Sequence, residues 1–358
     1  MLDSVLNPET PSSLRRRLWV VGAACLGLGL SLAGCVEDDD GDTGGDDTFR
    51  ERVIGVGYCP PELCGSNSDI GGAFSFDSRS VDANANMIFV TAITPEGDEA
   101  VIRVLRDRLE LQVGDNPPLQ NDEIVGSQLV FDHVEDGVAT GERTIIHVDG
   151  FQLDAVETWS SPKAQYSTYT FTFRDSDEPE EDRKPLCAEY PWPDSFGLDN
   201  LDSTAGLLVQ SESYDWYGRA IENVEDPFDW ATLGCMGGAY AKKVLMGYDP
   251  HHPGTPGEEG KPDLQQNEVM MRMLTARYCE GENHTDPGTP LYWQNEWGWN
   301  NFDDTEVELE ALWTPDGVAC LNTPRLVDRA AVEADCGTLP TCDDFDAADY
   351  HMASYRVL

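Results

Sequence analysis

The sequence predicts an α+β protein, with an antiparallel, β-rich N-terminal half (a sandwich or partly open barrel) followed by a disulfide-stabilised mixed α/β domain. The first half contains β-branched and apolar runs at short spacing, separated by Gly, Asn, Asp and Pro and not by helices. Aromatic and threonine side chains alternate over 166–173, which is typical of a half-buried strand. The runs that we expect to form strands are 87–93, 101–113, 124–134, 144–156 and 166–173.

The second half of the chain shows both helical and strand patterns. A helix is predicted over 233–246, because Gly247 follows it in the position that a left-handed cap needs. A second helix is predicted from Asp263, which forms a capping-box pattern with Gln266, to about Tyr278. Acidic and apolar residues alternate over 305–313, which predicts a strand whose solvent face carries Glu306, Glu308 and Glu310.

An acidic segment at 175–183 (DSDEPEEDR) breaks the strand pattern and marks the expected domain boundary. We therefore expect a β-rich domain over 53–180 and a second domain over 185–325. A C-terminal extension over 326–358 contains Cys336 and Cys342.

The N-terminus has the parts of a bacterial export signal. Three arginines at 15–17 precede an apolar run over 18–32, which is short for a spanning helix of about 20 residues. The run ends in Leu-Ala-Gly-Cys at 32–35, which matches the lipobox of bacterial lipoproteins. This resemblance implies that 1–34 is a signal peptide cleaved between Gly34 and Cys35. It also implies that the Cys35 thiol carries diacylglycerol, often with a further acyl chain such as palmitate. An ordinary cleaved signal peptide, or an uncleaved anchor, is the alternative.

The residues after the lipobox predict a lipid-anchored protein of the cell envelope. Residues 37–47 contain seven acids and otherwise only Gly and Thr, so 35–52 is expected to be a lipidated cysteine with a disordered tether. Val36 stands where retention at the inner membrane is signalled by Asp, which favours the outer membrane, at its periplasmic face or the cell surface. A calcium loop is the alternative, but the EF-hand register and its terminal Glu are missing.

The formal net charge of −44 at pH 7 restricts the partners. It argues against nucleic acid, whose phosphates bind Lys and Arg, and against direct adsorption to anionic lipid. We expect contact with the bilayer through the acylated N-terminus, and a surface glycan or another protein as the partner of the body. Solubility is the simpler explanation of the acidity and divalent-cation binding the alternative. The sequence predicts no cofactor and no metal site.

The cysteines predict disulfides. Cys25 lies in the signal and Cys35 takes the lipid, which leaves eight candidates in an exported chain and no zinc-type spacing. Short separations favour the local pairs Cys59–Cys64 and Cys336–Cys342, because small loops close at low entropic cost. The remaining four could pair in three ways, and we favour Cys235–Cys279 across the two predicted helices. The candidates are Cys59, Cys64, Cys187, Cys235, Cys279, Cys320, Cys336 and Cys342.

Four segments follow one another in the order of a known family. They are 186–187 (LC), 231–248 (ATLGCMGGAYAKKVLMGY), 276–289 with ARYC at its start, and 310–320 (EALWTPDGVAC). Over about 186–326 the chain thus resembles the ADYC domain of bacterial exported proteins and lipoproteins. Arg277 stands where the name-giving motif has Asp, and Lys243 stands where relatives often have a second Cys. The resemblance implies an exported module and no particular reaction.

Two groups of side chains could bind a ligand. The polar group around the tetrapeptide could hold a polar ligand, and a dense aromatic group over 292–299 could stack on sugars, peptides or cations. We favour a structural role for both groups, namely a disulfide with a capped turn for the first and core packing for the second, and ligand binding is the alternative. The candidate ligand site comprises Tyr278, His284, Thr285, Asp286, Trp293 and Trp297.

The favoured function is a membrane-anchored, non-catalytic module that binds a ligand or partner, and no catalytic residue is predicted. The alternative is a secreted hydrolase, because short stretches around Cys64, Cys235 and Asn295 resemble papain-like cysteine peptidases. There Cys64 would be the nucleophile, His284 the base and Asn295 the residue that orients the base. Cys59 lies close to Cys64, and a cysteine in a disulfide has no thiolate with which to attack. Paired cysteines and scattered histidines would favour the module.

Overall fold

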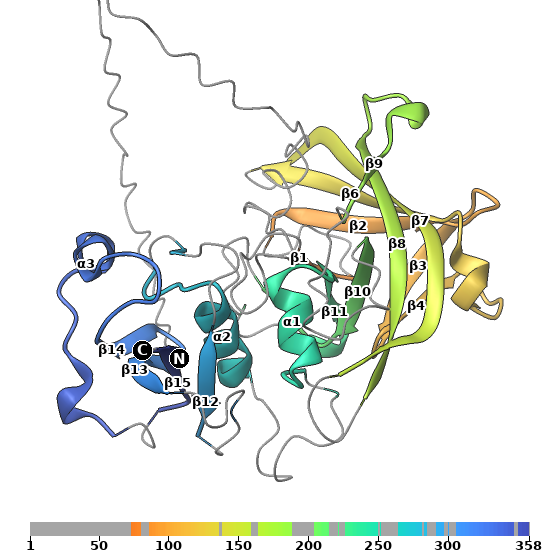
Figure 1. The fold of residues 1–358 in the computed structure, drawn as a ribbon. Helices are drawn as coiled ribbons and strands as arrows, with labels where there is room; N and C mark the ends of the chain where they lie inside the picture. The colour runs from red at the N-terminus through yellow and green to blue at the C-terminus, as the bar shows by residue number, and fades with distance from the viewer. Residues whose placement is uncertain are drawn as a thin grey trace, which may run out of the picture. The chain divides into compact units, whose positions relative to one another are not determined.

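In the computed structural model, the described residues lie within Asp46–Leu358 and form two antiparallel sheets and several helices (Figure 1). The predicted signal peptide, Cys35, the acidic tether, Cys59 and Cys64 lie outside the described residues. The described residues are 73–79, 86–135, 138–158, 164–187, 204–214, 221, 226–249, 251, 264–280, 283–284, 291–296, 300, 306–346 and 350–357.

Within the described residues, eleven strands form one large antiparallel sheet. Their order is β1-β11-β10-β8-β7-β6-β2-β3-β4-β5, and β9 pairs with β8. The first six strands in the chain are β1 (Ala73–Asp77), β2 (Ile88–Ile93), β3 (Glu99–Leu105), β4 (Arg108–Gln112), β5 (Leu119–Gln120) and β6 (Gln128–Glu135). The others are β7 (Val138–Glu157), β8 (Gln165–Asp175), β9 (Lys184–Pro185), β10 (Ala205–Gln210) and β11 (Trp230–Cys235).

The large sheet curls so that distant strands face each other across one core. Phe74 of β1 lies 5.1 Å, ring to ring, from Phe131 of β6, although four strands separate β1 and β6 in the sheet order. The backbone N–H of Gln210, at the end of β10, donates to the carbonyl of Arg106 in the β3–β4 turn at 2.7 Å. Buried and exposed side chains alternate along β2 and β3. The predicted antiparallel, β-rich fold is therefore confirmed.

A second sheet has four strands in the part of the chain that the structure describes, in the order β12-β15-β13-β14. Its strands are β12 (Tyr292–Asn295), β13 (Val307–Thr314), β14 (Gly317–Leu321) and β15 (Met352–Val357). The helices are α1 (Ala239–Leu245), α2 (Leu264–Leu274) and α3 (Arg329–Cys336), and the 3-10 turns are η2 (Asn121–Ile124), η3 (Glu180–Asp182), η5 (Pro227–Asp229) and η6 (Cys342–Asp344). One apolar core joins α1 and α2 to strands of both sheets.

The segment 233–246, predicted as one helix, is divided between a strand and a helix. β11 pairs with β1 and β10 on its two sides, and all six of its residues are buried. A continuous apolar run of this length has no period that distinguishes a buried strand from a helix. Gly234 of β11 is required, because a Cβ there would lie 2.4 Å from Cδ1 of Tyr240 in α1. Gly247 adopts the predicted left-handed conformation after α1, with a φ of 92°.

The acidic segment 175–183 does not end the large sheet. β10 and β11, which follow this segment in the chain, continue the sheet beside β8.

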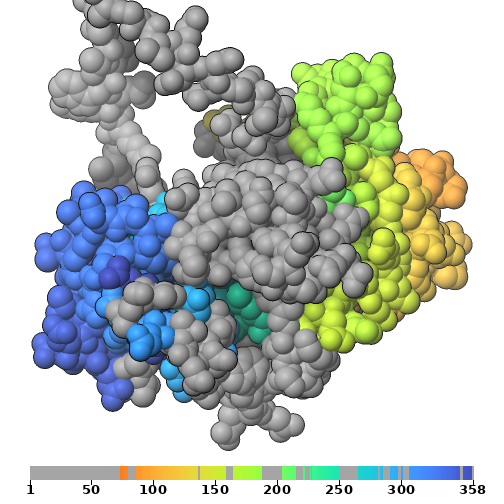
Figure 2. All heavy atoms as spheres, in the orientation of Figure 1, coloured from red at the N-terminus to blue at the C-terminus, as the bar shows by residue number. Residues whose placement is uncertain are grey.

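In the space-filling view, the teal residues around α1 show only a small area on this face (Figure 2), which agrees with the burial of all seven residues of α1. Among the described residues, no helix has the length and apolarity needed to cross a bilayer.

Candidate functional site

All six cysteines in the described part of the chain form disulfides. The pairs are Cys187–Cys235, Cys279–Cys336 and Cys320–Cys342, with Cα–Cα distances of 5.3, 5.6 and 5.1 Å. The prediction of a disulfide-stabilised body is therefore confirmed for these residues.

The predicted pairs Cys336–Cys342 and Cys235–Cys279 are wrong. Cys336 ends α3, and the chain then returns to β14, where the N–H of Leu321 donates to the carbonyl of Pro340 at 2.9 Å. This return places Cys342 beside Cys320 and leaves Cys336 facing Cys279. Loop-closure entropy favours the short Cys336–Cys342 loop over the long Cys279–Cys336 loop by only about 2 kcal/mol. The packing of the chain therefore decides the pairing.

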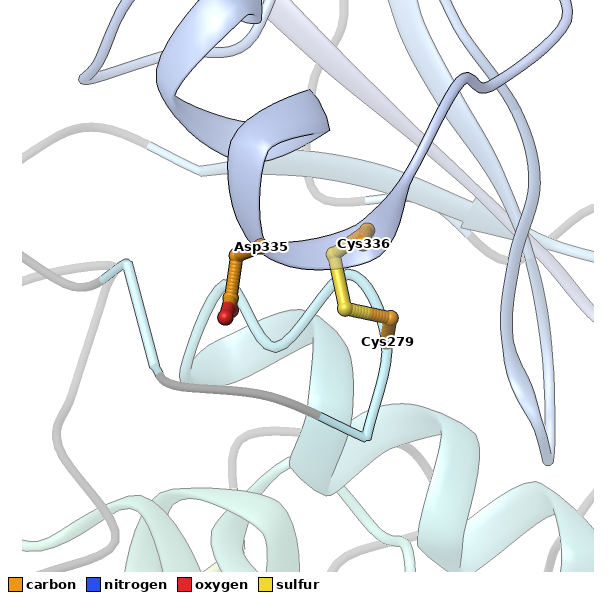
Figure 3. Close-up of side chains that lie close together, drawn as sticks. All are labelled: Cys279, Asp335 and Cys336. Carbon is orange, nitrogen blue, oxygen red and sulfur yellow. A yellow bond between two sulfur atoms is a disulfide. The ribbon is translucent and has the colours of Figure 1, made fainter.

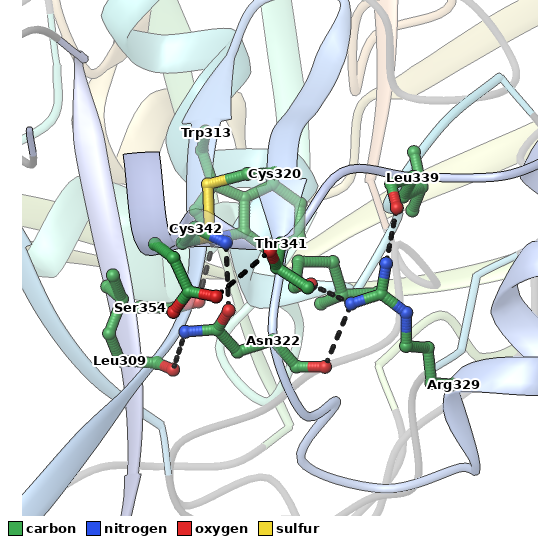
Figure 4. Close-up of a disulfide and its surroundings, with 11 residues drawn as sticks. Leu309, Trp313, Cys320, Asn322, Arg329, Leu339, Thr341, Cys342 and Ser354 are labelled. Atoms are coloured by element: carbon green, nitrogen blue, oxygen red, sulfur yellow. Dashed lines mark hydrogen bonds between the residues drawn. A yellow bond between two sulfur atoms is a disulfide. The ribbon is translucent and has the colours of Figure 1, made fainter. Parts of the chain in front are cut away.

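The Cys320–Cys342 disulfide is embedded in a hydrogen-bonded network (Figure 4). Asn322 accepts from the N–H of Cys342 at 2.9 Å and donates to the carbonyl of Leu309 at 3.2 Å. Arg329 donates to three backbone carbonyls, those of Leu321, Asn322 and Leu339. These contacts fix the C-terminal extension to the second sheet, so the surroundings of this disulfide are structural.

The tyrosine of the family tetrapeptide lies in a buried polar cluster. Tyr278 donates to Oε1 of Glu310 at 2.7 Å, and the same oxygen accepts from N and Nε of Arg325 at 2.9 and 3.0 Å. The Trp313 ring stacks on Tyr278 at 5.3 Å, and Arg325 lies 5.9 Å from the centre of the Trp313 ring. Burial, and then Glu310, raises the pKa of Tyr278 above its usual range. We call Tyr278, Glu310, Trp313 and Arg325 the tyrosine clamp.

Glu310 is fully buried, so its predicted place on the solvent face is wrong. The register between β13 and β15 shifts after Leu309, which pairs with Tyr355, and Ala311 then pairs with Ser354. A bulge of this kind inserts one unpaired residue and turns the side chains that follow. Here the extra residue is Glu310. Glu306 is exposed and Glu308 is half-buried, as expected for the outer side of the strand.

The structure brings two of the predicted ligand residues together, Tyr278 and His284. Their rings lie 5.8 Å apart, and the backbone N–H of His284 donates to the carbonyl of Ala276 at 3.1 Å. His284 Nε2 lies 3.5 Å from Oδ2 of Asp335, next to the Cys279–Cys336 disulfide (Figure 3). Cys279, Asp335 and Cys336 are close enough to hold a metal ion, but bonded sulfurs offer no thiolate.

Trp293 is a core residue and not an exposed stacking platform. Its side chain is buried in β12, and its ring meets that of Tyr248 edge to face at 5.7 Å. Asn295, on the same strand, donates to the Tyr248 hydroxyl at 2.8 Å. Thr285, Asp286 and Trp297 lie outside the described residues.

The residues of the alternative hydrolase have separate partners where the structure describes them. His284 faces the carboxylate of Asp335, and Asn295 bonds to the hydroxyl of Tyr248. Cys64 lies outside the described residues. Cys235, which a second papain-like stretch contains, is bonded to Cys187.

A second buried polar cluster was not predicted from the sequence. Nζ of Lys243, in α1, donates to Oε1 of Glu212, to the carbonyl of Tyr248 at 2.7 Å and to Oδ1 of Asn267 in α2 at 3.3 Å. Lys243, Glu212 and Asn267 are all buried. We call these three residues the lysine cluster. The sequence feature that could have indicated this cluster is a pair of lysines inside an otherwise apolar helix. Such a position is unusual for lysine, because this residue type is almost never fully buried.

Lys242, the residue before Lys243, is also buried but has different surroundings. Among the described residues its Nζ has no hydrogen-bond partner. Burial alone lowers the pKa of Lys242 well below its usual range. Polar side chains thus hydrogen-bond to the amine of Lys243, whereas none does so to the amine of Lys242 among the described residues.

A family model, that of the ADYC domain, matches residues 121–327, which is more than half of the chain. The chain belongs to the ADYC domain family. No curated protein and no solved structure matches it.

The ADYC domain starts earlier than the sequence resemblance indicated, because the match includes β6, β7 and β8 of the large sheet. Both clusters, the tyrosine clamp and the lysine cluster, lie within it. Cys336 and Cys342 lie beyond its end, so two disulfides join the ADYC domain to the C-terminal extension. Arg277, which replaces the Asp of the name-giving motif, is buried and lies 3.6 Å from Oε2 of Glu280.

Proposed function

We propose that the chain is an exported lipoprotein of the bacterial cell envelope, whose disulfide-bonded ADYC body is a non-catalytic binding module. The observation that carries the proposal is the pairing of all six described cysteines in disulfides. Disulfides persist in oxidising compartments outside the cytoplasm, which is where the predicted signal peptide would deliver the chain. The lipobox at 32–35 supplies the anchor on Cys35.

The use of the family motif within the fold supports the non-catalytic part of the proposal. The Tyr278 hydroxyl is taken up by Glu310, and Cys279 is bonded to Cys336. Both side chains therefore stabilise the packing of the second sheet against α2 and α3. A surface glycan or a protein partner would bind elsewhere on the acidic surface, with the bilayer contacted through the acylated N-terminus at the outer membrane.

The anchor is tested by membrane fractionation of cells that produce the full chain. We expect the wild type in the outer-membrane fraction, released by detergent and not by high salt. Cys35→Ala should appear in the soluble extracytoplasmic fraction or as unprocessed precursor. Cys25→Ala is the matched control, because this cysteine lies in the signal and should leave anchoring unchanged. Equal membrane retention of the wild type and Cys35→Ala would refute the proposal.

The non-catalytic part is tested with a thiol alkylator and a peptide-substrate panel on folded, non-reduced protein. We expect no stoichiometric label and no cleavage. Labelling at Cys64, with cleavage lost in His284→Ala, would replace the module by the hydrolase.

A further inference from the structure

Three groups that can react with one another meet in the lysine cluster. The amine of Lys243 lies 3.3 Å from the side-chain carbonyl oxygen of Asn267. The carboxyl group of Glu212 is hydrogen-bonded to the same amine. An amine, a carboxamide and a carboxyl group are the components of a transamidation, with the carboxyl group as the proton carrier.

The surroundings of the lysine cluster exclude water. Lys243 is 0% exposed, Glu212 2% and Asn267 3%. The rings of Tyr214 and Tyr240 lie over the amine, with their centres 5.7 and 5.1 Å from Nζ. In such a place the charged forms of an amine and a carboxyl group carry a large desolvation cost.

The carboxyl group of Glu212 is suited to hold a proton. Burial raises its pKa, and this effect exceeds the opposing effect of Lys243. Proton transfer from the lysine ammonium to this carboxylate leaves Lys243 as a free amine, which is the nucleophilic form.

We propose that Lys243 and Asn267 form an intramolecular isopeptide bond, with Glu212 as the catalytic acid and base. Nζ of Lys243 attacks Cγ of Asn267, the Nζ–Cγ bond forms, and the Cγ–Nδ2 bond breaks. Glu212, protonated by the lysine ammonium, gives this proton to Nδ2 and then takes one from Nζ, so that ammonia leaves, Glu212 ends protonated, and no oxidant or further reactant is needed. The product is a secondary amide that links α1 to α2.

The fold holds the two groups next to each other, with Nζ of Lys243 3.3 Å from Oδ1 of Asn267. Lys243 is held on α1 by its bond to the carbonyl of Tyr248, and Asn267 is fixed on α2, which packs against α1. Groups held in contact in this way react as if at very high concentration. Lys242 provides the contrast, since its amine has no carboxamide or carboxyl partner among the described residues.

The test is peptide mapping of the purified, folded, full-length wild type after reduction and alkylation. A protease that cuts between positions 243 and 267 should yield a branched peptide that contains both residues. Its mass should be lower than the sum of the two separate peptides by one ammonia molecule. Recovery of the two peptides only as separate, unmodified species from folded wild type would overturn the proposal, whatever the variants do.

Variants assign the roles of the three residues. Glu212→Gln keeps the shape of the side chain, and its bond-forming rate should fall by about 100-fold or more because the proton carrier is lost. Lys243→Arg and Asn267→Ala should yield no branched peptide. Lys242→Arg and Asn295→Ala are the matched controls, and both should keep it. A branched peptide that persists at the wild-type rate in Glu212→Gln would contradict the role of Glu212.

Discussion

Replacement of Arg325 by methionine tests the energetics of the tyrosine clamp. Arg325 is the cation beside Glu310, and the two side chains are 1% and 0% exposed. Its removal leaves a buried carboxylate without its cation, a change that typically destabilises a protein by about 3–5 kcal/mol. With an unfolding entropy of about 2.1 cal/mol/K per residue, a folded body of about 300 residues should then lose about 5–8 °C in Tm.

Arg356→Met is the matched control, because Arg356 pairs with Glu308, two residues before Glu310 on β13. Both side chains of this control pair are 37% exposed, so its loss should change the free energy of unfolding by less than about 1 kcal/mol. Urea unfolding at neutral pH gives the free energy of unfolding of both variants. The comparison requires that this free energy falls with urea concentration at the same slope in all proteins. Equal effects of the two substitutions would refute the reasoning.

Tyr278→Phe removes one hydrogen bond to the carboxylate of Glu310 and should lower the free energy of unfolding by about 1.5–3 kcal/mol.

Three further predictions concern other parts of the fold. Lys242→Met removes a buried amine that has no hydrogen-bond partner in the described part of the chain, and it should raise the free energy of unfolding by about 1–3 kcal/mol in urea; a loss of stability would contradict this. The double variant Cys320→Ala/Cys342→Ala opens a loop of 22 residues and should lower stability by about 3 kcal/mol, measured by calorimetry against non-reduced wild type; an unchanged Tm would refute it. Burial lowers the pKa of His147 below 6.5, so the unfolded state binds more protons and stability should fall as the pH drops below 6.5 through the folded pKa. In His147→Gln this part of the acid-induced loss should disappear, and an unchanged pH profile would exclude His147 as its source.

The sequence predicted the elements whose side chains alternate with a clear period. The alternation over 166–173 correctly predicted a strand, which is part of β8. The cap at Gly247 after the helix was also predicted correctly. The run over 101–113 was expected to be one strand, but it turns at Arg106 into the β3–β4 hairpin. Arg106 adopts a positive φ of 61° there, which its residue type does not indicate.

The candidate site was predicted less completely, because its chemistry depends on long-range contacts. Glu310 looked like a solvent-facing acid until the bulge in β13 turned it toward Tyr278 and Arg325. Lys243 was noted only as a departure from the family pattern, since its partners lie 31 and 24 residues away in the chain. Pairing of cysteines by short separation failed for the same reason: loop entropy is a small term beside the packing of α3.

The mass of the N-terminal peptide of protein extracted from membranes tests the proposed function most directly. We predict a peptide that begins at Cys35 and carries a diacylglycerol on its thiol. A peptide that retains residues before Cys35, or a Cys35 without lipid in membrane-derived protein, would contradict the assignment as a lipoprotein.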